Sequence, residues 1–541
     1  MKLFINAKIV SPSLEIPEEF DAIAVKDGKI FSIGQSSSLK SDASEIVDLE
    51  GRVLLPGFID PHAHPLMYGQ MMDWVDVGPA KAKSIEEIVQ ILIKADKELP
   101  ANQPLRAFGY EHRNLVEGRH PTRNDLDRIS KTREIYVMNA SGHGGAVNSL
   151  ILTKNGISKE TPDPRGGSFE RDESGNPSGV IWDAACDILT GSSGVKVENH
   201  GPNFHLPDDQ EILTKQFLQA QNQFIKYGVT SIGDAQVSLR EFETYLDAQS
   251  KNKLRSRYSF YLISSLLKNA PKLRSNPNID RVMLTADGIK MYADGTLGGW
   301  TAYFPEGYQA DRNRKGQLYH DAAEFTEIFL ECARNGFDIA THAQSPTAIG
   351  MVINSVKQVH EKSITKTNGS YPISRVEHCG LPDSNEINEM SKLGIIAVSQ
   401  PIHHHNWGDG VVTAVGKEVG ERFNPLGEFE RNNVNFALSS DAPVGKPNPF
   451  EAISAAVNRR TVHGTELGSA NLKISIRTAL IAHSLGGAKA LGKEKVAGSI
   501  EVGKFADFAI VEENPLQVSP DDIGKLKVKE TYLGGNKVFS S

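Results

Sequence analysis

Two histidines, His62 and His64, follow an apolar run and are separated by a single residue. Side chains alternate between the two faces of a β-strand, so both imidazoles point to one side if this stretch is extended. Neutral imidazole is the commonest protein ligand of zinc-like metals, and two imidazoles on one face supply half of a tetrahedral coordination shell. Because such pairs also arise by chance, the interpretation depends on matching ligands elsewhere in the chain.

Further residues that can bind a metal stand at the ends of later apolar segments. These candidate ligands are Lys290, His342, His378 and Asp441. A lone strand-end histidine is more often structural than a ligand, and an aspartate before Ala-Pro is also suited to start a turn. Reactive groups of a parallel barrel, however, collect at the carboxyl ends of its strands. Five of eight predicted strands ending in such residues therefore indicate one shared site.

The strands that would position these residues alternate with helical segments. After the strand that carries the first two histidines, the expected strands cover 228–234, 257–263, 288–295, 337–342, 374–378, 394–400 and 434–441. Eight β/α units predict an α/β fold of the (β/α)8 TIM-barrel type.

Both ends of the chain have a different character from this body. Residues 1–55 and 490–541 consist of short strand and turn patterns, which predict one split β-sandwich domain built from both termini. The barrel then spans 56–489. Residues 67–207 are too many for one βα connection, so they predict a long insertion after the first barrel strand that helps to cover the site.

The composition excludes several classes of protein. Of the 541 residues, 39% are hydrophobic and 23% are charged, as in a globular protein, and a net charge of −8 with interspersed signs excludes a basic surface for nucleic acid. The three cysteines are widely spaced and predict no disulfide framework. With neither a signal peptide nor an apolar stretch of membrane-spanning length, we expect a cytoplasmic protein that binds no membrane; homo-oligomer formation stays open.

The ordered set PGFIDPHAH, Lys290, THA, VEHC and SSDAPV resembles the metal-dependent amidohydrolase superfamily. The stretches GIKMYADGTLGGWTAYF, TRNDLDR and GSIEVGKFADFAIV are similar to the amidohydrolase-3 branch, which includes N-substituted formamide deformylases. The resemblance covers nearly the whole chain. It implies an enzyme that hydrolyses a carbon–nitrogen bond other than a peptide bond in a small-molecule amide, formamide or related compound.

The resemblance also implies a role for each strand-end residue. His62 and His64 would hold one divalent ion, most naturally zinc, with Asp441 as a further ligand. His342 and His378 would hold a second ion. A metal lowers the pKa of bound water from about 15.7 toward neutrality, and the resulting hydroxide attacks the carbonyl carbon. Asp441 would act as the general acid and base that moves the proton to the departing nitrogen.

Lys290 is the unusual member of this set, since an ammonium would repel two cations. In relatives a lysine at this place is carbamylated by CO2, which replaces the positive charge with an anionic group that bridges both metals. The alternative is an ordinary amine that pairs with Asp294 or Asp441 and leaves a single metal. The electrostatic cost of an uncompensated ammonium favours the bridging form.

Other residues are candidates for contacts with the substrate. His143 lies in a polar stretch of the insertion, and aromatic side chains commonly line ligand pockets. The aromatic candidates are Tyr110, Trp182, Trp300 and Trp407. The run from His403 to His405 is interpreted as a loop, because adjacent residues of an extended chain face opposite sides and cannot all bind one ion. Many relatives carry His-Ala-x-Gly-Asp after the fifth strand, whereas this chain has HAQSP at 342–346, so substrate specificity does not carry over.

Two rival functions remain. The first is a deaminase of an amino-heterocycle with one metal at His62, His64, His342 and Asp441. Such enzymes place a glutamate near the end of the fifth strand, and THAQSPT contains none. The second is a non-catalytic binding protein on a decayed barrel, which the complete ligand set argues against.

Overall fold

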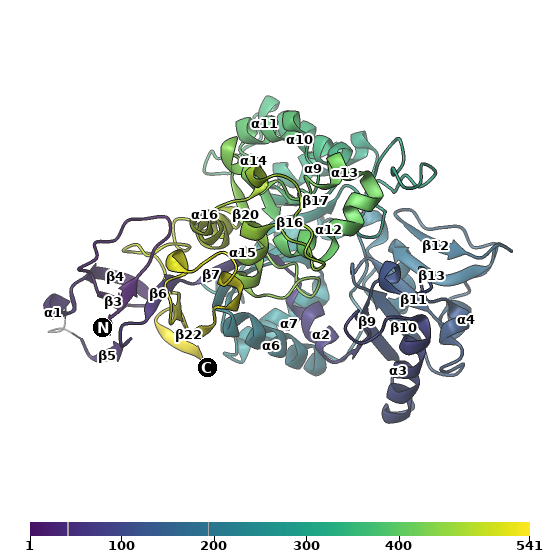
Figure 1. Cartoon of the computed structure of the whole chain (residues 1–541), viewed down its shortest axis with the longest axis horizontal. Coiled ribbons are helices and arrows are strands. Elements are labelled where there is room, and N and C mark those ends of the chain that lie inside the picture. Colours follow the sequence, from purple (N-terminus) through teal and green to yellow (C-terminus); the bar gives the residue numbers. More distant parts are fainter. Residues whose placement is uncertain (40–42, 193) are drawn as a thin grey trace.

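A computed structural model describes residues 1–39, 43–192 and 194–541. Along the longest axis of the molecule, a β-rich region formed by both ends of the chain is followed by a central α/β body and then by a second β-rich region (Figure 1). The N- and C-termini both lie in the first of these regions.

The central body contains one parallel eight-stranded sheet with its strands in sequence order. These strands are β7 (Phe58–Ala63), β14 (Val229–Val237), β15 (Arg257–Ile263), β16 (Leu284–Tyr292), β17 (Asp338–Ala343), β18 (Ser374–His378), β19 (Ile396–Ser399) and β20 (Phe436–Leu438). The predicted TIM-type barrel is confirmed, and it places the carboxyl ends of all eight strands on one face.

At this face, hydrogen bonds join the last residues of β7 and His64 to the segment that follows β20. The amide of Asp441 donates to the carbonyl of His62 at 2.9 Å, and the amide of His64 donates to the carbonyl of Ala442 at 2.8 Å. Ser440 Oγ also donates to Asp60 Oδ2 at 2.5 Å. The backbone that carries His62 and His64 is therefore fixed directly against the backbone that carries Asp441.

Helices cover the outside of the barrel. They include α6 (Gln210–Lys226), α7 (Leu239–Ser250), α9 (Ala322–Arg334), α10 (Pro346–Glu361), α11 (Ser384–Leu393) and α15 (Pro449–Asn458). Their starts follow from local sequence: Ser238 with Glu241 and Asp383 with Glu386 form capping boxes. Buried aromatic residues of these helices, such as Phe217 of α6 and Phe325 and Phe329 of α9, pack into the core and hold the helices on the sheet.

The segment between β7 and β14 forms a second sheet with the strand order β12-β13-β11-β10-β9-β8. Its strands are β8 (Val75–Asp76), β9 (Leu105–Tyr110), β10 (Ile135–Asn139), β11 (Gly144–Val147), β12 (Gly167–Arg171) and β13 (Pro177–Asp183). Helix α3 (Ile85–Glu98) packs on it and begins as predicted, since Ser84 accepts a hydrogen bond from the amide of Glu87.

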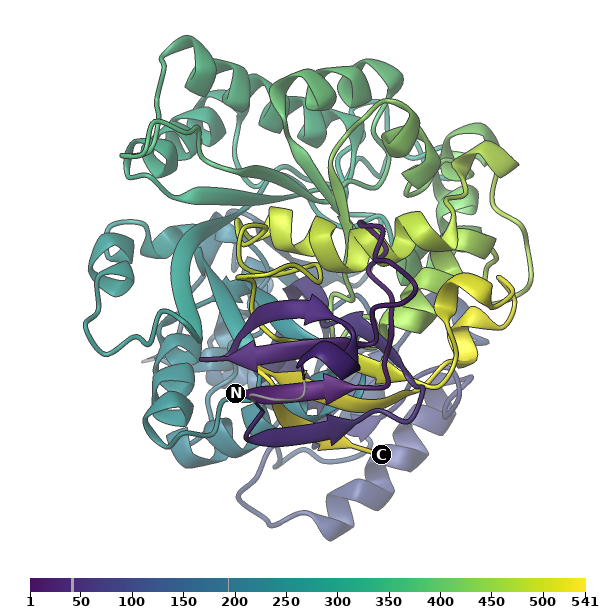
Figure 2. The same cartoon turned by 90° about the vertical axis from the view of Figure 1, so that its left-hand side faces the viewer.

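The two ends of the chain supply two further sheets. One has the order β4-β3-β1-β5, from β1 (Lys2–Ile5), β3 (Ala22–Lys26), β4 (Lys29–Gly34) and β5 (Glu45–Asp48). The other has the order β2-β6-β21-β22-β23, from β2 (Lys8–Ile9), β6 (Val53–Pro56), β21 (Phe508–Val511), β22 (Val528–Leu533) and β23 (Asn536–Ser540). The N-terminal strands lie over the C-terminal ones (Figure 2), and Phe4 packs edge-on against Phe508 and Tyr532 between them. The exact domain limits stay predictions.

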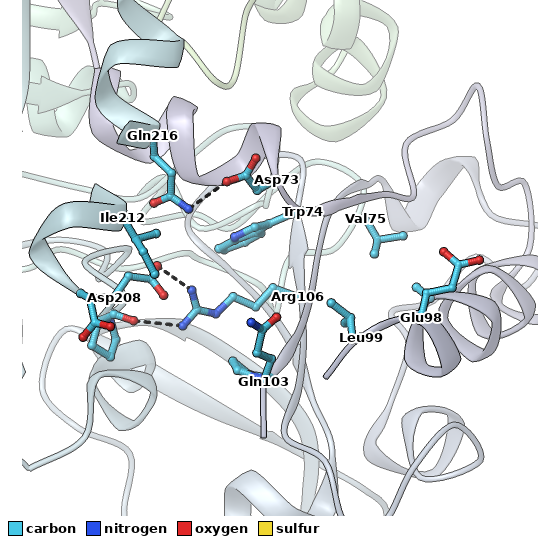
Figure 3. Close-up of a pocket in the computed structure, with 14 residues that line it drawn as sticks. Asp73, Trp74, Val75, Glu98, Leu99, Gln103, Arg106, Asp208, Ile212 and Gln216 are labelled. Carbon is cyan, nitrogen blue, oxygen red and sulfur yellow. Dashed lines mark hydrogen bonds and ion pairs between the residues drawn. The ribbon is translucent and has the colours of Figure 1, made fainter. Parts of the chain in front are cut away.

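A groove of about 790 Å³ lies where the inserted sheet meets the barrel (Figure 3). Arg106 Nη1 binds Asp208 across it at 3.0 Å, and Trp74 and Ile212 line it. None of the predicted metal ligands borders this groove, so the candidate chemistry lies elsewhere. Within the described part of the chain, no helix has the length and apolar character needed to cross a membrane.

Candidate metal centre

Three predicted ligands converge at the carboxyl face of the barrel. Nε2 of His64 lies 3.2 Å from Oδ1 of Asp441, and Nε2 of His62 lies 3.4 Å from the same oxygen. All three side chains are buried. Ligand atoms on one tetrahedral zinc, with bonds of about 2.0–2.1 Å, are separated by about 3.3 Å. The spacing of these three atoms therefore fits a single divalent ion.

The backbone around these ligands is strained. Asp441 has a φ of 54° and His378 a φ of 66°, both in the left-handed region. Non-glycine residues held there cost about 1–3 kcal/mol each, and such strain is concentrated at functional sites. The hydrogen bonds between the end of β7 and the segment after β20 hold Asp441 in this conformation. The conformation turns the Asp441 carboxylate toward His62 and His64.

Each of three histidines gives one ring nitrogen to a protein acceptor. His62 Nδ1 donates to Glu377, His342 Nε2 donates to the carbonyl of Gly295 at 3.0 Å, and His378 Nδ1 donates to Gln400 Oε1 at 2.8 Å. The opposite nitrogen of each ring is left with its lone pair, the state that a metal ligand requires.

Burial also favours the neutral form of these rings. It lowers the pKa of His62 to about 4 and holds the pKa values of His342 and His378 well below their usual range. Neutral imidazoles are thus present near neutral pH, and only neutral imidazole binds a metal.

A buried ion pair supports His62 from behind. Arg375 and Glu377 lie two residues apart on β18 and are both fully buried, with Nε 2.7 Å from Oε1. Burial opposes the ionisation of Glu377, but Arg375 and His62 together hold the pKa of its carboxyl below the usual range. Glu377 therefore accepts the His62 proton as a carboxylate and fixes the orientation of that ring.

Asp234, at the end region of β14, lies on the opposite side of the site. Its Oδ1 is 3.9 Å from Nδ1 of His64, and its Oδ2 accepts a hydrogen bond from the hydroxyl of Tyr245 at 2.7 Å. Burial raises the pKa of Asp234 to about 7. This carboxyl therefore lies beside the nitrogen that His64 turns away from Asp441.

Lys290 is buried on β16, and its Nζ has no hydrogen-bond partner among the described residues. Burial lowers the pKa of its amine to about 8. Asp294, one of the two partners expected for an ordinary amine, instead accepts backbone hydrogen bonds from Tyr303, Gln344 and Ser345. An orphaned amine in this position fits a further group bound to Nζ.

His403 was not among the predicted ligands, yet it reaches the site. With His378 and Asp441 it forms a second set of three ligand atoms close enough to share an ion. The predicted loop at 403–405 is wrong: these residues belong to helix α12 (Pro401–Val415). Successive side chains of a helix point in different directions, so His404 and His405 face backbone carbonyls elsewhere. Pro401 at the helix start was the available signal.

Two small enclosed spaces, about 30 and 20 Å³, adjoin Asp441. The first is bordered by Met67, Phe204 and Tyr292 together with the site histidines, and the second by Thr296, Gln344, His403, Trp407 and Phe423. We name the second space the Trp407 chamber. Each is large enough for about one or two water molecules.

Of the residues predicted to contact substrate, the structure brings two to these spaces. His143 borders both, and its Nδ1 donates to Asp183 Oδ1 at 2.8 Å; Trp407 borders the chamber named after it. Tyr110, Trp182 and Trp300 border neither. Tyr110 lies in the core of the insertion, Trp182 Nε1 donates to Glu170 at 2.8 Å, and Trp300 stacks on Tyr308.

Comparisons with known proteins agree with this geometry. The sequence model of the amidohydrolase family matches residues 45–539 of this chain. The chain is 25% identical to the N-substituted formamide deformylase of Arthrobacter pascens, with 95% of this chain and 94% of that protein aligned. It is 27% identical to the protein LONG AFTER FAR-RED 3 of Arabidopsis thaliana over 99% of this chain and 91% of that one.

The fold matches an uncharacterized metal-dependent hydrolase from Pyrococcus horikoshii OT3 with a TM-score of 0.76 at 23% identity, covering 96% of this chain and 99% of that one. A match of the family model over nine-tenths of the sequence, together with a barrel that gathers His62, His64 and Asp441, identifies the chain. This protein belongs to the amidohydrolase family and is a metal-dependent hydrolase of carbon–nitrogen bonds other than peptide bonds.

Proposed function

We propose that this hydrolase cleaves the amide bond of a small uncharged compound, such as an N-substituted formamide, with one or two zinc-like ions. The ions would be held by His62, His64, Lys290, His342, His378 and Asp441. One observation carries the proposal: the Nε2 atoms of His62 and His64 both lie within 3.4 Å of one carboxylate oxygen of Asp441. The similarity to the formamide deformylase of Arthrobacter pascens supports the type of bond.

When bound, divalent ions supply the Lewis acidity that makes water ionise near neutral pH and that polarises a carbonyl group. The residues of this chain supply the proton transfers. Burial opposes the ionisation of Asp441, but His62, His64 and His403 hold the pKa of its carboxyl below the usual range. As a carboxylate, Asp441 can accept the proton of the attacking water and return it to the departing nitrogen.

Lys290 is proposed to carry a CO2-derived carbamate when two ions are bound. The support is its buried Nζ, which has no hydrogen-bond partner in the described part of the chain. As an ammonium this group would be close to two cations, which is electrostatically costly. A carbamate would exchange that positive charge for an anionic group with oxygens for both ions.

The lining of the two spaces supports an uncharged substrate. Among the described residues, neither space is bordered by an arginine or lysine that could pair with an anionic substrate. Trp407 and Phe423 offer apolar contact for a substituent, while Thr296 and Gln344 offer polar contact. Anchoring a carboxylate or phosphate in such a pocket would bury a charge without a partner.

His143 is proposed to contact the carbonyl group of the substrate. Its ring is 5.2 Å from that of His342, measured between centroids, and Asp183 binds its Nδ1. Asp183 in turn accepts a hydrogen bond from the hydroxyl of Tyr319 at 2.6 Å. This chain of contacts fixes the His143 ring beside the site; donation to the carbonyl oxygen would need a second N–H on that ring, for which Asp183 would be the counter-ion.

The deaminase rival has less support. At the place where a deaminase needs a glutamate, this chain has Gln344, whose Oε1 already accepts a hydrogen bond from the amide of Leu297. The binding-protein rival is disfavoured by the outer contacts: a site without catalysis has no need for Glu377 behind His62 or Gln400 behind His378.

Metal analysis and substrate screening test the proposal together. The purified chain is stripped with a chelator, reloaded with Zn²⁺, and assayed on amides, formamides, ureas, cyclic imides and amino-heterocycles. We expect metal-dependent release of an amine from an amide or formamide, and its loss in His62→Ala. Ammonia release from amino-heterocycles alone would establish the deaminase instead. A protein without divalent metal, in which His62→Ala leaves activity unchanged, would refute the proposal.

A further inference from the structure

Gln344 follows the predicted metal ligand His342 by two positions, just after strand β17 ends. Its backbone is held on both sides: its amide donates to Asp294 Oδ1 at 2.9 Å, and its carbonyl accepts a hydrogen bond from the amide of Leu381 at 3.0 Å. The side chain is buried and borders the Trp407 chamber. Gln344 therefore presents its side-chain amide to this space from a fixed position.

The orientation of this side-chain amide is determined by one contact. The backbone amide of Leu297 donates to Gln344 Oε1 at 3.1 Å. Because a backbone N–H can only donate, the acceptor oxygen lies at this contact and the NH2 group takes the other position. Among the described residues, Gln344 Nε2 has no hydrogen-bond partner. The NH2 group is therefore the part of the side chain that is available to a molecule in the chamber.

The oxygen atoms that border the chamber do not offer a matching acceptor. The hydroxyl of Thr296 and that of Ser141, which accepts a 3.4 Å hydrogen bond from the amide of His143, can rotate and either donate or accept. In the described part of the chain, Asp441 is the only carboxylate that borders the chamber, and its Oδ1 faces the histidines of the metal site. The chamber thus offers a substrate the fixed donor of Gln344, but no side-chain oxygen that is fixed as a free acceptor.

The position of the chamber relates this donor to the substrate. Asp441, which is proposed to return the proton to the departing nitrogen, borders the chamber, and Trp407 and Phe423 line it with apolar surface for the substituent of that nitrogen. A purely hydrocarbon substituent would cover the NH2 group of Gln344 and leave it without any partner, which is unfavourable for a buried donor. An acceptor on the substituent would remove this cost.

We propose that Gln344 selects substrates whose nitrogen substituent carries an uncharged oxygen acceptor, such as an ether or carbonyl oxygen, to which Nε2 donates. The inference rests on the amide hydrolysis proposed above and narrows its substrate class. A substituent of this class is apolar where it meets Trp407 and Phe423 and polar where it meets Gln344. An ammonium group in the place of that oxygen would face the N–H bonds of Gln344 and would be disfavoured.

Matched pairs of substrates test the inference. In each pair, an N-alkyl amide or formamide is compared with the analogue in which one CH2 group of the alkyl chain is replaced by an ether oxygen, at successive positions along the chain. The quantity measured for the zinc-loaded enzyme is kcat/KM of the ether divided by kcat/KM of the hydrocarbon. Gln344→Met keeps the length of the side chain but has no donor. In this variant the ratio should fall about 10-fold for at least one ether position.

Gln344→Glu tests the same contact in the opposite direction. One carboxylate oxygen can still accept the hydrogen bond from the amide of Leu297, and the other replaces the NH2 group with an acceptor. The ratio of ether to hydrocarbon should again fall about 10-fold, and kcat/KM for a substituent with an ammonium group at that position should rise about 10-fold relative to the hydrocarbon. This second variant also covers the case in which Gln344→Met does not fold.

Helix α10 offers a matched control. Gln358 Oε1 accepts a hydrogen bond from Lys362 Nζ at 2.7 Å, and Gln358 does not border the chamber. Gln358→Met and Gln358→Glu should therefore keep the wild-type ratio. Zinc content is measured for every variant, because Gln344 is close to His342 in the sequence. A change that only disturbed the metal would lower kcat/KM for both members of a pair and leave their ratio unchanged.

The outcomes separate this inference from the function on which it rests. A ratio within about twofold of the wild-type value in both Gln344 variants, at every ether position, would overturn the inference, while the proposed hydrolase would stand. A wild type that hydrolyses no amide or formamide would refute both. A fall of the ratio in Gln344→Met, with the exchange of preference in Gln344→Glu, would establish Gln344 as the residue that selects the substituent.

Discussion

Arg375 donates two hydrogen bonds to Glu377, its neighbour two positions along strand β18, at 2.7 and 2.9 Å. Residues two apart on a strand share a face, so the sequence Arg-Val-Glu-His itself brings the pair together. Arg375 also donates to the carbonyl of Pro61, beside His62. One buried ion pair thus ties the backbone of β7 to β18 and orients the first metal ligand.

Glu377→Gln should substantially lower the free energy of unfolding at neutral pH. The change leaves the Arg375 guanidinium buried without a counter-ion, which costs about 3–5 kcal/mol. The pKa of Glu377 is lower in the fold than its ordinary value of 4.5, so its contribution is present above pH 4.5 and is lost as the pH falls further. The thermal midpoint of the metal-free variant should therefore lie well below that of the wild type at pH 7, with a smaller gap in acid.

The surface pair of Arg334 and Glu327 provides the control. Glu327→Gln should leave the midpoint unchanged at every pH, because exposed ion pairs contribute little. A Glu377→Gln midpoint equal to that of the wild type at pH 7 would show that the buried pair is not needed for stability.

Asp441→Asn should abolish most of the activity while leaving the fold intact. The amide cannot accept a proton from water, and general acid–base catalysis typically contributes 10²–10⁴-fold. We expect kcat to fall by roughly 10³-fold, with part of the loss caused by weaker metal binding. Zinc content measured beside kcat separates the two effects, and Asp409→Asn on helix α12 is the matched control. A variant with full zinc and full activity would exclude Asp441 as the acid and base.

Local patterns predicted much of this architecture. The barrel strands from β14 to β20 lie at the apolar runs from which they were predicted. A parallel strand that is buried on both faces has a nearly continuous apolar sequence. The Ser84 cap and the turn at Asp27 and Gly28, both with positive φ, follow equally local rules. The six predicted ligands lie at or near the carboxyl ends of these strands. In a parallel barrel all of those ends lie on one face, so the order of the strands is enough to predict a shared site.

Contacts that depend on distant packing could not be predicted. His403 looked like part of a loop, since its direction depends on a helix that starts at Pro401. The bond between His143 and Asp183 joins residues 40 positions apart in the insertion. Tyr110 and Trp182 are aromatic, as pocket-lining residues often are, but both are buried in the packing of the inserted sheet. Nothing in the sequence around these residues distinguishes the two uses.

Lys290 should carry a carbamate in the metal-loaded protein. Incubation of stripped protein with ¹³C-labelled bicarbonate and Zn²⁺ should give one carbamate carbon resonance. Lys290→Gln should give no such signal, because an amide side chain does not react with CO2. The exposed Lys392→Gln serves as control and should keep the signal. A wild type with two bound ions and no carbamate resonance would show that the ions are not bridged through Lys290.

Trp407 should determine how tightly apolar substituents bind. It borders the Trp407 chamber, and burying an aromatic or aliphatic substituent is typically worth about 1.5–3 kcal/mol. Trp407→Ala should therefore raise KM for an amide with a bulky apolar substituent by about 10- to 100-fold, while kcat changes much less. A substrate whose substituent is a single methyl group gains little from this contact, so its KM should change little.

Trp74, in the groove of Figure 3, is the control for removal of a tryptophan. Because neither Asp441 nor any residue of the Trp407 chamber borders that groove, Trp74→Ala should leave both KM values unchanged. Equal rises in KM for bulky and methyl substrates in Trp407→Ala would mean that the ring only supports His403, on which it packs. A rise confined to the bulky substrate would assign the chamber to the substituent of the amide.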